Sequence, residues 1–434
     1  MKDFLLVDFG ASRIKAAHLI EDNIKNVNSY PSVAPCIDKN NKFEVSSLDI
    51  KNKFIKIIDQ YYKEHTFQGI LLCSEMHGFI IVDKNNNALS NYISWKTERS
   101  VNIYEGEQVS NFNKLSSLIN EKFLAKTGMR IRACYPIFNI YDMAKSGEFN
   151  GGKIISLPEW LCCCDGKSTN KAHITMSAGM GFYNINNDKF DEDLIKIIDK
   201  PICFNEVVKD IEIGGYLNIR GNELPIYTGV GDHQCAVLGA GNTINTISVN
   251  LGTGSQVAMI KGEKSLCERV PYFAGKTLSV IKHIPSGRMF NCFMNFFKSI
   301  NPQENFWDKM DNLKVSDILK SDLNMNLSIF KSAWNYENGG CISGINEGNF
   351  TEKNFLASII KNYIMQYKVA IDELSPDKNH NKIILSGGIP AKIPIVKEYL
   401  AMITGYDVSY NHGNFDETIL GLKIIKNKYL KGVN

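Results

Sequence analysis

Residues 4–19 read FLLVDFGASRIKAAHL, and this stretch decides how the rest of the chain is interpreted. The apolar run 4–7 predicts a strand, residues 8–13 predict a tight polar turn, and residues 14–19 predict a returning strand. The same order recurs at 247–260, where ISVNL is followed by GTGS and then by QVAMI. Two hairpins with small residues at their tips, each opening one half of the chain, favour a pair of duplicated domains.

Strand and helix patterns alternate along the remainder of the chain. Apolar residues recur at helical spacing before a predicted strand at 69–73, namely Phe54, Ile57, Ile58 and Tyr61. A second helical pattern follows a plausible cap at Thr351, and a strand at 382–386 then leads through two glycines to a helix at 394–404. A chain of 434 residues exceeds one ordinary hydrophobic core. We therefore expect an α/β protein with a domain boundary near residue 240.

The composition excludes several classes of protein. The 49 basic and 46 acidic residues leave a net charge of only +3, without the clustered excess that binding to a nucleic acid requires. No run of eighteen apolar residues is present, and Asp8 interrupts the first apolar stretch too early for a signal peptide. The 11 cysteines include no Cys-x-x-Cys pair and are scattered through apolar runs. We expect a cytoplasmic protein with reduced cysteines and neither nucleic acid nor membrane as a partner.

The first predicted turn places Asp8 at the end of a strand, directly before the uncluttered backbone of Gly10 and Ala11. Such a turn can direct backbone N–H groups at a phosphate, while the carboxylate holds a hydrated magnesium ion. Asp-x-Gly at a strand end is also common turn chemistry without any ligand. Considered by itself, this turn favours the structural interpretation.

Two further glycine turns strengthen the phosphate interpretation. Gly252, Thr253 and Gly254 in the second hairpin offer a matching clamp from the second domain. Gly387 and Gly388 offer backbone at the head of a helix, where a nucleotide can lie flat, although a plain β-to-α turn has the same sequence. The three turns in this order are harder to dismiss than any one of them.

Asp232 follows a predicted strand at 226–230 and precedes a short helical run. A carboxylate at the mouth of an interdomain cleft is suited to accept a proton from a substrate hydroxyl as a phosphoryl group arrives. Aspartate is equally suited to be the N-cap of a helix. Position alone leaves both roles open.

Taken in order, residues 8–12 (DFGAS), 74–78 (SEMHG), 231–234 (GDHQ), 251–253 (LGT) and 386–388 (SGG) resemble the successive signatures of the FGGY carbohydrate kinases. That family belongs to the actin, hexokinase and Hsp70 superfamily. The resemblance spans almost the whole chain and is far more specific than any single motif. It implies two ribonuclease-H-like domains around a catalytic cleft, ATP with magnesium, and phosphorylation of a sugar hydroxyl.

The resemblance also implies a role for individual residues. A first domain, 1–240, holds the sugar site and the catalytic base Asp232, and a second domain, 241–434, binds the nucleotide. The residues implied to bind the nucleotide and its phosphates are Asp8, Gly10, Ala11, Ser12, Arg13, Gly252, Thr253, Gly387, Gly388 and Lys392. Those implied to bind the sugar are Met76, His77, Trp95, His233, Gln234 and Arg288. Asp8 is also expected to hold the magnesium ion through water.

Other segments bear on the choice of sugar. Residues 268–273 (ERVPYF) and 283–288 (HIPSGR) look most similar to sedoheptulokinase-like members, and Met76-His77 matches the xylulokinase-like ones. We expect sedoheptulose or a related C5–C7 ketose as substrate, with xylulokinase-like or ribulokinase-like activity as the alternative. Glu75, Thr97 and His233 depart from the family pattern, and Thr97 stands where a carboxylate is common. These departures affect the identity of the sugar and leave the phosphoryl-transfer residues intact.

Proteins of two other kinds share this fold. A catalytically silent sugar-binding protein is one, but the retention of Asp8 and Asp232 argues against it. A nucleotide-driven chaperone or filament is the other, and the Met76-His77 pair and Trp95 favour a small sugar instead. We expect the protein to bind ATP and a small-molecule ketose as a monomer or homodimer.

Overall fold

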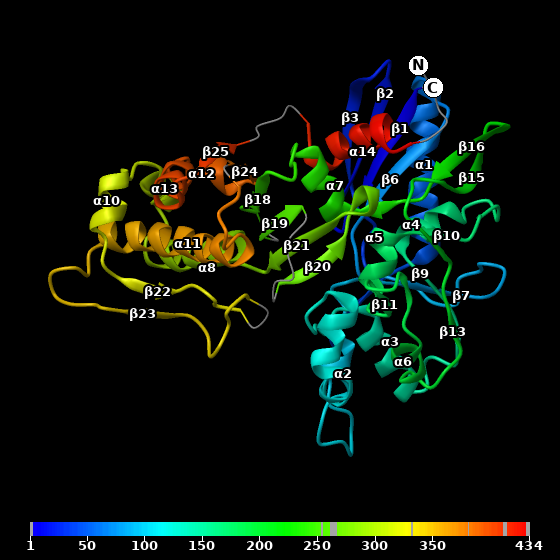
Figure 1. The fold of residues 1–434 in the computed structure, drawn as a ribbon, viewed down its shortest axis with the longest axis horizontal. Coiled ribbons are helices and arrows are strands. Elements are labelled where there is room, and N and C mark those ends of the chain that lie inside the picture. The colour runs from blue at the N-terminus through cyan, green and yellow to red at the C-terminus, as the bar shows by residue number, and fades with distance from the viewer. Residues whose placement is uncertain are drawn as a thin grey trace. The chain divides into compact units, whose positions relative to one another are not determined.

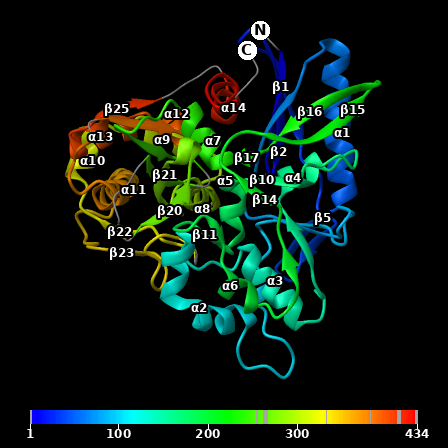
Figure 2. The same ribbon diagram turned by 45° about the vertical axis from the view of Figure 1, so that its right-hand side comes forward.

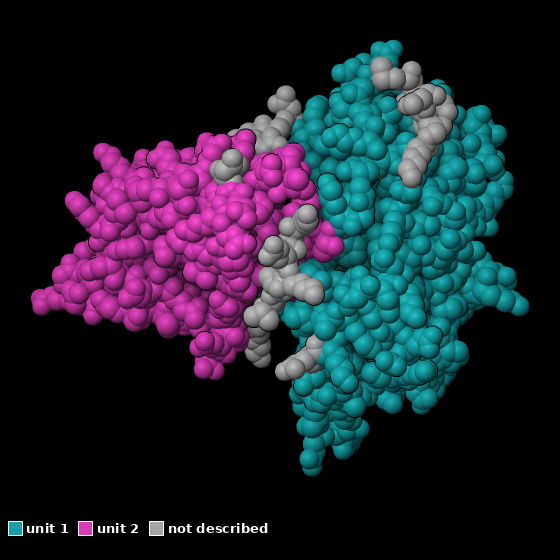
Figure 3. Space-filling view, viewed as in Figure 1, with its two compact units in different colours: residues 1–239, 269–276, 415–434 teal, residues 240–268, 277–414 magenta. Residues whose placement is uncertain are grey.

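The computed structural model describes residues 3–252, 255–260, 267–330, 333–380, 382–410 and 415–430. The chain divides into two compact units, coloured separately in Figure 3. Unit 1 comprises residues 1–239, 269–276 and 415–434, and unit 2 comprises residues 240–268 and 277–414. The sequence predicts a single change of domain at residue 240. The compact units divide the chain differently, because segments 269–276 and 415–430 pack with unit 1.

A mixed sheet forms the centre of unit 1, with the order β15-β16-β6-β1-β2-β3 (Figure 1). Strands β1, β2 and β3 form an antiparallel meander, whereas β6 runs parallel to β1. The short strand β17 also pairs with β6, which brings its end beside the end of β1. The strands are β1 (Phe4–Phe9), β2 (Arg13–Ile20), β3 (Asn23–Pro31), β6 (Ile70–Ser74), β15 (Ile213–Ile219), β16 (Asn222–Tyr227) and β17 (Val230–Gly231).

Unit 2 repeats this arrangement, with the order β21-β19-β18-β24-β25. Strands β18, β19 and β21 are again an antiparallel meander, and β24 runs parallel to β18 as β6 does to β1. The strands are β18 (Thr246–Asn250), β19 (Gln256–Ile260), β21 (Thr277–Lys282), β24 (Lys382–Ser386) and β25 (Asp407–Tyr410). The shared topology confirms that the two hairpins seen in the sequence belong to duplicated folds.

Helices and short strands complete both units (Figures 1 and 2). The helices of unit 1 are α1 (Ser47–Glu64), α2 (Asn111–Thr127), α3 (Pro136–Lys145), α4 (Leu157–Cys162), α5 (Ile174–Ser177), α6 (Glu192–Lys196), α7 (Asp232–Gly239) and α14 (Glu417–Lys428). Those of unit 2 are α8 (Gly287–Ile300), α9 (Phe306–Asp311), α10 (Val315–Lys320), α11 (Glu352–Leu374), α12 (Ile389–Lys392) and α13 (Ile395–Thr404). None of the helices described here is long and apolar enough to cross a membrane.

The shorter strands pair in small sheets separate from the two central ones. In unit 1 they are β4 (Ile37–Lys39), β5 (Lys42–Val45), β7 (Ile80–Val82), β8 (Tyr92–Ile93), β9 (Gly152–Ile155), β10 (Lys171–His173), β11 (Tyr183–Asn184), β12 (Lys189–Phe190), β13 (Ile202–Cys203) and β14 (Glu206–Val208). Strands β22 (Asn324–Asn326) and β23 (Cys341–Ser343) form a hairpin in unit 2. The strand predicted at 226–230 is interrupted, because β16 ends at Tyr227 and β17 begins at Val230.

The apolar stripes read from the sequence form the cores of both units. The four residues predicted to share a face of α1 are all buried, and the helix begins where Ser46 accepts a hydrogen bond from Asp49 N. Helix α11 begins at the predicted cap Thr351, whose side chain accepts from Asn354 N. The helix predicted at 394–404 is α13, which ends at Gly405 in the left-handed conformation. These elements are confirmed because their burial and their capping residues agree.

Helices α7 and α14 pack backbone against backbone (Figure 1). A Cβ atom added at Gly239 would overlap the carbonyl oxygen of Glu417, and one added at Gly421 would overlap that of Cys235. The Cys235 thiol donates to the carbonyl oxygen of Thr418 over 3.2 Å at the same crossing. Because the two glycines lack side chains, α7 and the amino-terminal part of α14 can approach this closely. Helix α7 begins at Asp232, so the crossing also fixes the position of that residue.

We expect Gly421→Ala to destabilise the protein although alanine is the better helix former. The intrinsic preference favours alanine by about 0.5–1 kcal/mol, but the overlap with Cys235 forces the helices apart and overpacking typically costs about 1–3 kcal/mol. The free energy of unfolding in urea should therefore fall. Gly348→Ala is the control, since the nearest atom would lie at an ordinary 3.4 Å. Stability of Gly421→Ala equal to that of the wild type would contradict this account of the crossing.

Candidate active site

The first predicted phosphate turn joins β1 to β2. Asp8 is buried near the end of β1, and Lys15 is its cross-strand partner on β2. The turn closes where Gly10 N donates to the carbonyl oxygen of Arg13 over 3.2 Å. The hydroxyl of Ser32 donates to the carbonyl oxygen of Gly10 over 2.9 Å. These bonds leave the backbone at 10–12 partly open on a rigid frame.

The two carboxylate oxygens of Asp8 have different surroundings. Oδ2 accepts from the hydroxyl of Thr418 over 2.7 Å and lies 3.4 Å from the ammonium group of Lys15. Oδ1 is buried and has no hydrogen-bond partner. A Cβ atom at Gly10 would lie 3.9 Å from Oδ1, so this oxygen faces the glycine turn. Burial raises the pKa of Asp8, and the charge of Lys15 opposes that rise.

These features fit a site for a hydrated magnesium ion. The unpartnered oxygen of Asp8 is the kind of ligand that the ion prefers, and the bare backbone of Gly10 leaves space beside it. Among the residues that the structure describes, no His, Cys, Asp or Glu side chains gather in a group large enough to enclose a metal by themselves. An ion held by one carboxylate, water and nucleotide phosphates is consistent with both observations.

Asp232 is the first residue of α7, directly after β17. Its Oδ1 accepts a hydrogen bond from His233 N over 2.7 Å. Burial raises the pKa of the Asp232 carboxyl to about 7, and the negative charge of Asp8 adds to the rise. Gly231 N donates to the hydroxyl of Thr175 over 3.1 Å, which fixes the approach to the helix. Asp232 is thus a proton acceptor that titrates near neutral pH.

Glu75 accepts a hydrogen bond from Trp95, one of the residues expected to contact the sugar. The hydroxyl of Tyr92 donates to Oε1 of Glu75 over 2.6 Å, and the indole nitrogen of Trp95 donates to Oε2 over 3.0 Å. Burial raises the pKa of Glu75 to about 7 despite these bonds. Trp95 is 39% exposed. Its ring is therefore accessible while its nitrogen is held by Glu75.

Met76 and His77 follow Glu75 in the loop after β6. Met76 is buried against Gly231, where an added Cβ atom would lie 2.8 Å from its sulfur, so it lies next to Asp232. His77 adopts a positive φ of 65°. Its Nδ1 lies 2.8 Å from the carbonyl oxygen of Gly179, and its ring centroid lies 4.7 Å from that of Tyr135. Of the predicted sugar-contacting pair, Met76 thus lies next to Asp232, and His77 lies against Gly179 and Tyr135.

The two glycine turns of unit 2 contact each other. Leu251 N donates to the carbonyl oxygen of Ser386 over 2.9 Å, and Ile389 N donates to that of Leu251 over 3.1 Å. Gly387 has a φ of 88°, and an added Cβ atom would lie 2.8 Å from Gly252 N. Gly388 faces open space. The turns predicted to bind nucleotide therefore form one continuous backbone surface.

Three further residues of the second half of the chain were predicted to bind the nucleotide or the sugar. The predicted residue Thr253 lies outside the described residues. Lys392 is exposed on α12, with its ammonium group 4.5 Å from the ring centroid of Trp307. Arg288, predicted to bind the sugar, is exposed at the start of α8, 4.6 Å from the ring of Phe330. Both cations are thus held over aromatic rings of unit 2 itself.

Some predicted residues have structural contacts instead. Gln234 is fully buried, and its amide nitrogen donates to the carbonyl oxygen of Pro271 over 3.3 Å, which ties segment 269–276 to α7. Arg13 donates to Ser29 on β3 over 2.5 Å to the hydroxyl and 2.9 Å to the carbonyl oxygen. His233 is half-buried in the first turn of α7, and Ala11 and Ser12 form the tip of the first turn. The geometry favours a structural role for Gln234.

The segment 95–99 explains why a carboxylate is missing at position 97. The hydroxyl of Thr97 donates to the carbonyl oxygen of Phe43 over 2.8 Å and accepts from Phe43 N over 2.9 Å. Arg99 is 1% exposed and donates to Asp142 over 2.7 Å. It also donates to Glu148 over 2.5 Å. Thr97 and Arg99 therefore hold the loop to its neighbours, and the exposed Glu98 is the nearest carboxylate in sequence.

Lys15, Asp416 and Thr418 belong to the site but were not predicted. The ammonium group of Lys15 lies 2.6 Å from Oδ2 of Asp416. Strand alternation across the first hairpin would have placed Lys15 opposite Asp8. Thr418 and Asp8 are 410 positions apart, and nothing local in the sequence indicates their contact.

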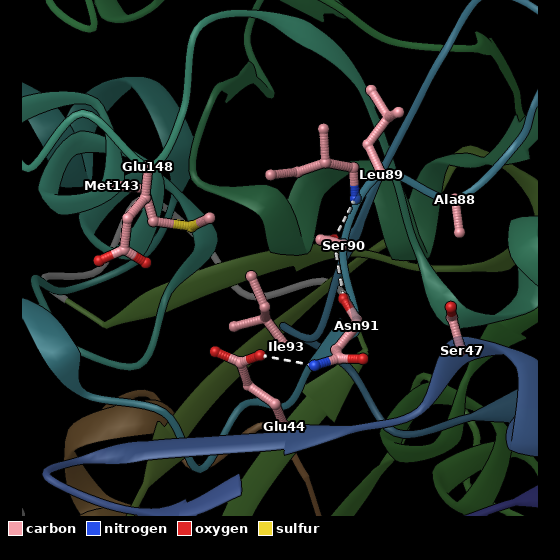
Figure 4. Close-up of a pocket in the computed structure, with 10 residues that line it drawn as sticks. Glu44, Ser47, Ala88, Leu89, Ser90, Asn91, Ile93, Met143 and Glu148 are labelled. Atoms are coloured by element: carbon pink, nitrogen blue, oxygen red, sulfur yellow. Dashed lines mark hydrogen bonds between the residues drawn. The ribbon is translucent and has the colours of Figure 1, made fainter. Parts of the chain in front are cut away.

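A separate cavity of about 500 Å³ opens on unit 1 (Figure 4). Glu44 and Asn91 lie on its wall, where the amide of Asn91 donates to Glu44 over 3.1 Å. Glu148, which also lines it, is the carboxylate that pairs with Arg99. None of the predicted site residues lines this cavity, so it is distinct from the surroundings of Asp8 and Asp232.

Buried carboxylates beside a glycine turn on a duplicated α/β fold are typical of nucleotide-dependent phosphotransferases. Residues 4–239 match the FGGY family of carbohydrate kinases, N-terminal domain. The match covers more than half of the chain, and the chain belongs to the FGGY family of carbohydrate kinases. The family inferred from the ordered motifs is thereby confirmed.

Curated relatives match over part of their length. The glycerol kinase of Lactococcus lactis subsp. lactis (strain IL1403) is 28% identical over 206 residues, which are 45% of this chain and 41% of that protein. The glycerol kinase of Brachyspira hyodysenteriae (strain ATCC 49526 / WA1) is 33% identical over 134 residues, 30% of this chain and 26% of that protein. The chain thus spans less than half of the length of these relatives.

Solved structures match over nearly the whole chain. The xylulose kinase of Lactobacillus acidophilus superposes with a TM-score of 0.80 at 16% identity, covering 98% of this chain and 92% of that one. The xylulose kinase of Rhodospirillum rubrum gives 0.83 at 12% identity, with 98% and 89% covered. The glycerol kinase of Plasmodium falciparum with ADP gives 0.77 at 16%, with the same coverage. These matches confirm the predicted α/β class with two ribonuclease-H-like domains.

We expect Glu75→Gln to flatten the pH dependence of stability. The pKa of Glu75 is raised from 4.5 to about 7, so the folded protein binds a proton that the unfolded chain has released. This bound proton contributes up to about 3 kcal/mol to the free energy of unfolding. The contribution is fully present below pH 4.5 and is lost as the pH rises to about 7. Glutamine can still accept from Trp95 and donate to the hydroxyl of Tyr92.

Urea unfolding measured from pH 4.5 to 8 tests this expectation. The variant should lose less free energy of unfolding over that interval than the wild type, while Asp232 continues to titrate in both. Glu192→Gln, at an exposed position on α6, is the control and should retain the wild-type slope. Identical slopes for Glu75→Gln and the wild type would show that Glu75 is ionised throughout.

Proposed function

We propose that this chain is an ATP-dependent sugar kinase that phosphorylates a hydroxyl of a ketose, sedoheptulose or a related C5–C7 ketose. The observation that carries the proposal is the position of Asp232 at the start of α7, with a pKa raised by burial to about 7. Asp8, in the same unit, keeps one carboxylate oxygen without a partner. A base and a ligand for a phosphate-bound ion are the parts that phosphoryl transfer to an alcohol requires.

Asp232 accepts the proton of the sugar hydroxyl in this proposal. A carboxylate that titrates near the working pH is an effective general base, because it is ionised before the reaction and basic enough to hold the proton afterwards. Asp8 would hold magnesium, which when bound supplies positive charge that balances the nucleotide phosphates. Gly10 N already donates within the turn, so the N–H groups of Ala11 and Ser12 at its tip are the donors proposed for a phosphate.

Unit 1 supplies the sugar site and unit 2 supplies the nucleotide site in this proposal. Met76 offers an apolar surface next to Asp232, and His77 and the exposed ring of Trp95 offer a polar edge and a stacking face for a polyol chain. In unit 2, Gly252 and Gly387 form one backbone surface, and Gly388 opens beside it. All 11 cysteines of the chain are free thiols, which supports an activity in the reducing cytoplasm.

The substrates named for the related proteins are tested alongside sedoheptulose. The solved structures include proteins named xylulose kinase and gluconate kinase, and the curated relatives are named glycerol kinase. Glu75 and His233 differ from the xylulokinase-like members and Thr97 differs from the family pattern, so the identity of the sugar is open to test, with xylulokinase-like or ribulokinase-like activity as the alternative. An FGGY chain that binds sugar without turnover is the alternative outcome.

The proposed activity is tested by measuring ADP release from magnesium–ATP over a panel of sugars. The panel comprises sedoheptulose, xylulose, ribulose, fructose, gluconate and glycerol. We expect a ketose of five to seven carbons to give the highest kcat/KM. Sugar-independent ADP release throughout, with calorimetric binding of a ketose, would leave the sugar-binding protein as the correct description.

We expect Asp232→Asn to lower sugar-dependent turnover by about two to four orders of magnitude, the usual contribution of a general base. Binding of nucleotide and sugar should persist, because asparagine is also an effective helix cap. In the wild type, turnover should fall as pH drops below about 7, since the protonated carboxyl cannot accept the proton. Near-normal turnover of the variant would remove Asp232 from the mechanism.

A further inference from the structure

The carboxyl-terminal segment of the chain contacts the proposed metal-binding carboxylate. The hydroxyl of Thr418, in the first turn of α14, lies 2.7 Å from Oδ2 of Asp8 and 2.7 Å from Oδ1 of Asp416. Lys15 lies 2.6 Å from the other oxygen of Asp416 and 3.4 Å from Asp8. One oxygen of Asp8 is therefore engaged by residues that lie at opposite ends of the sequence.

The arrangement fixes the orientation of the Asp8 carboxylate. With Oδ2 held by Thr418 and Lys15, rotation about the Cβ–Cγ bond would break both contacts. Oδ1 is thereby kept facing the Gly10 turn, where it has no partner within the protein. A carboxylate that already has the orientation needed to bind the ion loses less rotational entropy on binding, which favours tighter binding.

Asp416 and the helix crossing hold Thr418 in turn. Asp416 is the N-cap of α14, and its Oδ1 accepts from Thr418 N over 3.2 Å. Burial raises the pKa of Asp416, but the charge and hydrogen bond of Lys15 outweigh it and lower the pKa overall, which keeps the cap ionised. Gly421 presses α14 against α7 one turn later. The position of Thr418 is therefore set by backbone contacts and does not depend on its own side chain.

We propose that Thr418 and Asp416 are positioning residues that orient Asp8 for a divalent cation bound to nucleotide phosphates. The inference rests on the proposed function and extends its metal site to the last helix of the chain. Thr418 itself touches neither the ion nor the phosphates. Oδ1 of Asp416 already accepts from Thr418 N, so the single proton of the Thr418 hydroxyl is assigned to Oδ2 of Asp8. The hydroxyl acts by holding Oδ2, so that Oδ1 is presented to the ion.

The test compares Thr418→Val with Thr418→Ser. Valine has almost the shape of threonine but no hydroxyl, whereas serine keeps the hydroxyl and loses a methyl group. Calorimetry measures binding of ATP with magnesium and with EDTA, and a second titration measures binding of the preferred ketose. Thermal unfolding of each variant reports on the fold.

We expect valine to weaken magnesium-dependent ATP binding about tenfold, the effect of losing one hydrogen bond to a charged group. Serine should bind within about twofold of the wild type. Binding of ATP in EDTA and binding of the ketose should be unchanged in both variants. Equal magnesium dependence in valine and wild type would overturn the proposal, as would parallel losses of all ligands together with a lower melting temperature.

Asp416→Asn provides a second, independent variant if valine prevents folding. Asparagine retains the cap of α14, but Lys15 loses its nearest anion and competes more strongly with a cation for Asp8. Magnesium-dependent binding of ATP should again weaken while ketose binding is retained. Unchanged magnesium dependence in this variant would contradict the positioning role of Asp416.

The outcomes separate this inference from the proposed function. A wild type that binds magnesium–ATP but phosphorylates no sugar, combined with weaker binding in valine alone, supports the positioning role and rejects the kinase. An active wild type whose valine variant binds magnesium–ATP normally retains the kinase and rejects the positioning role. A wild type that binds no magnesium–ATP rejects both.

Discussion

The crossing of α7 and α14 is the contact on which the site depends. Gly239 and Gly421 bring two backbones into direct contact, so neither helix can shift without breaking it. Helix α7 carries Asp232 on its first residue, and α14 carries Thr418 in its first turn. Since Thr418 bonds to Asp8, one rigid junction relates the proposed base to the proposed metal ligand. Direct backbone packing fixes the relative positions of the two helices more firmly than side-chain contacts do, because side chains can repack.

The charges at this junction are costly to bury, and their arrangement indicates function. Asp8, Glu75 and Asp232 each have a pKa raised by burial. The charge of Asp8 further raises the pKa of Glu75 and of Asp232, and the charge of Glu75 further raises that of Asp232. A fold selected for stability alone would place apolar residues there. Lys15 compensates part of the charge and stays bonded to Asp416, which leaves an oxygen of Asp8 unpaired. An unpaired buried oxygen is reasonable where a cation completes its coordination.

Local features of the site could be predicted from the sequence because they depend on neighbouring residues. Asp8, Gly10 and Asp232 lie at strand ends and turns whose residue types are readable in windows of about ten residues. The helices α1 and α11 follow from apolar spacing and from the caps Ser46 and Thr351. Residues 415–430 could not be assigned to unit 1 in this way, since their partners are hundreds of positions away. The predicted boundary at 240 treated the chain as two contiguous halves for the same reason.

A sequence motif also fails to predict the role of a residue when its side chain makes structural contacts instead of binding a ligand. Trp95 is a predicted sugar-contacting residue, whereas Arg99, four positions later, is buried with Asp142 and Glu148 and is unavailable to a ligand. The residue that controls Trp95 is Glu75, which lies 20 positions earlier and accepts the indole N–H. Glu75 also accepts from the hydroxyl of Tyr92, so each of its two oxygens has a partner within the protein. The departure at position 75 therefore acts on the orientation of Trp95 and on the charge beside Asp232, and both effects follow from one buried carboxyl group.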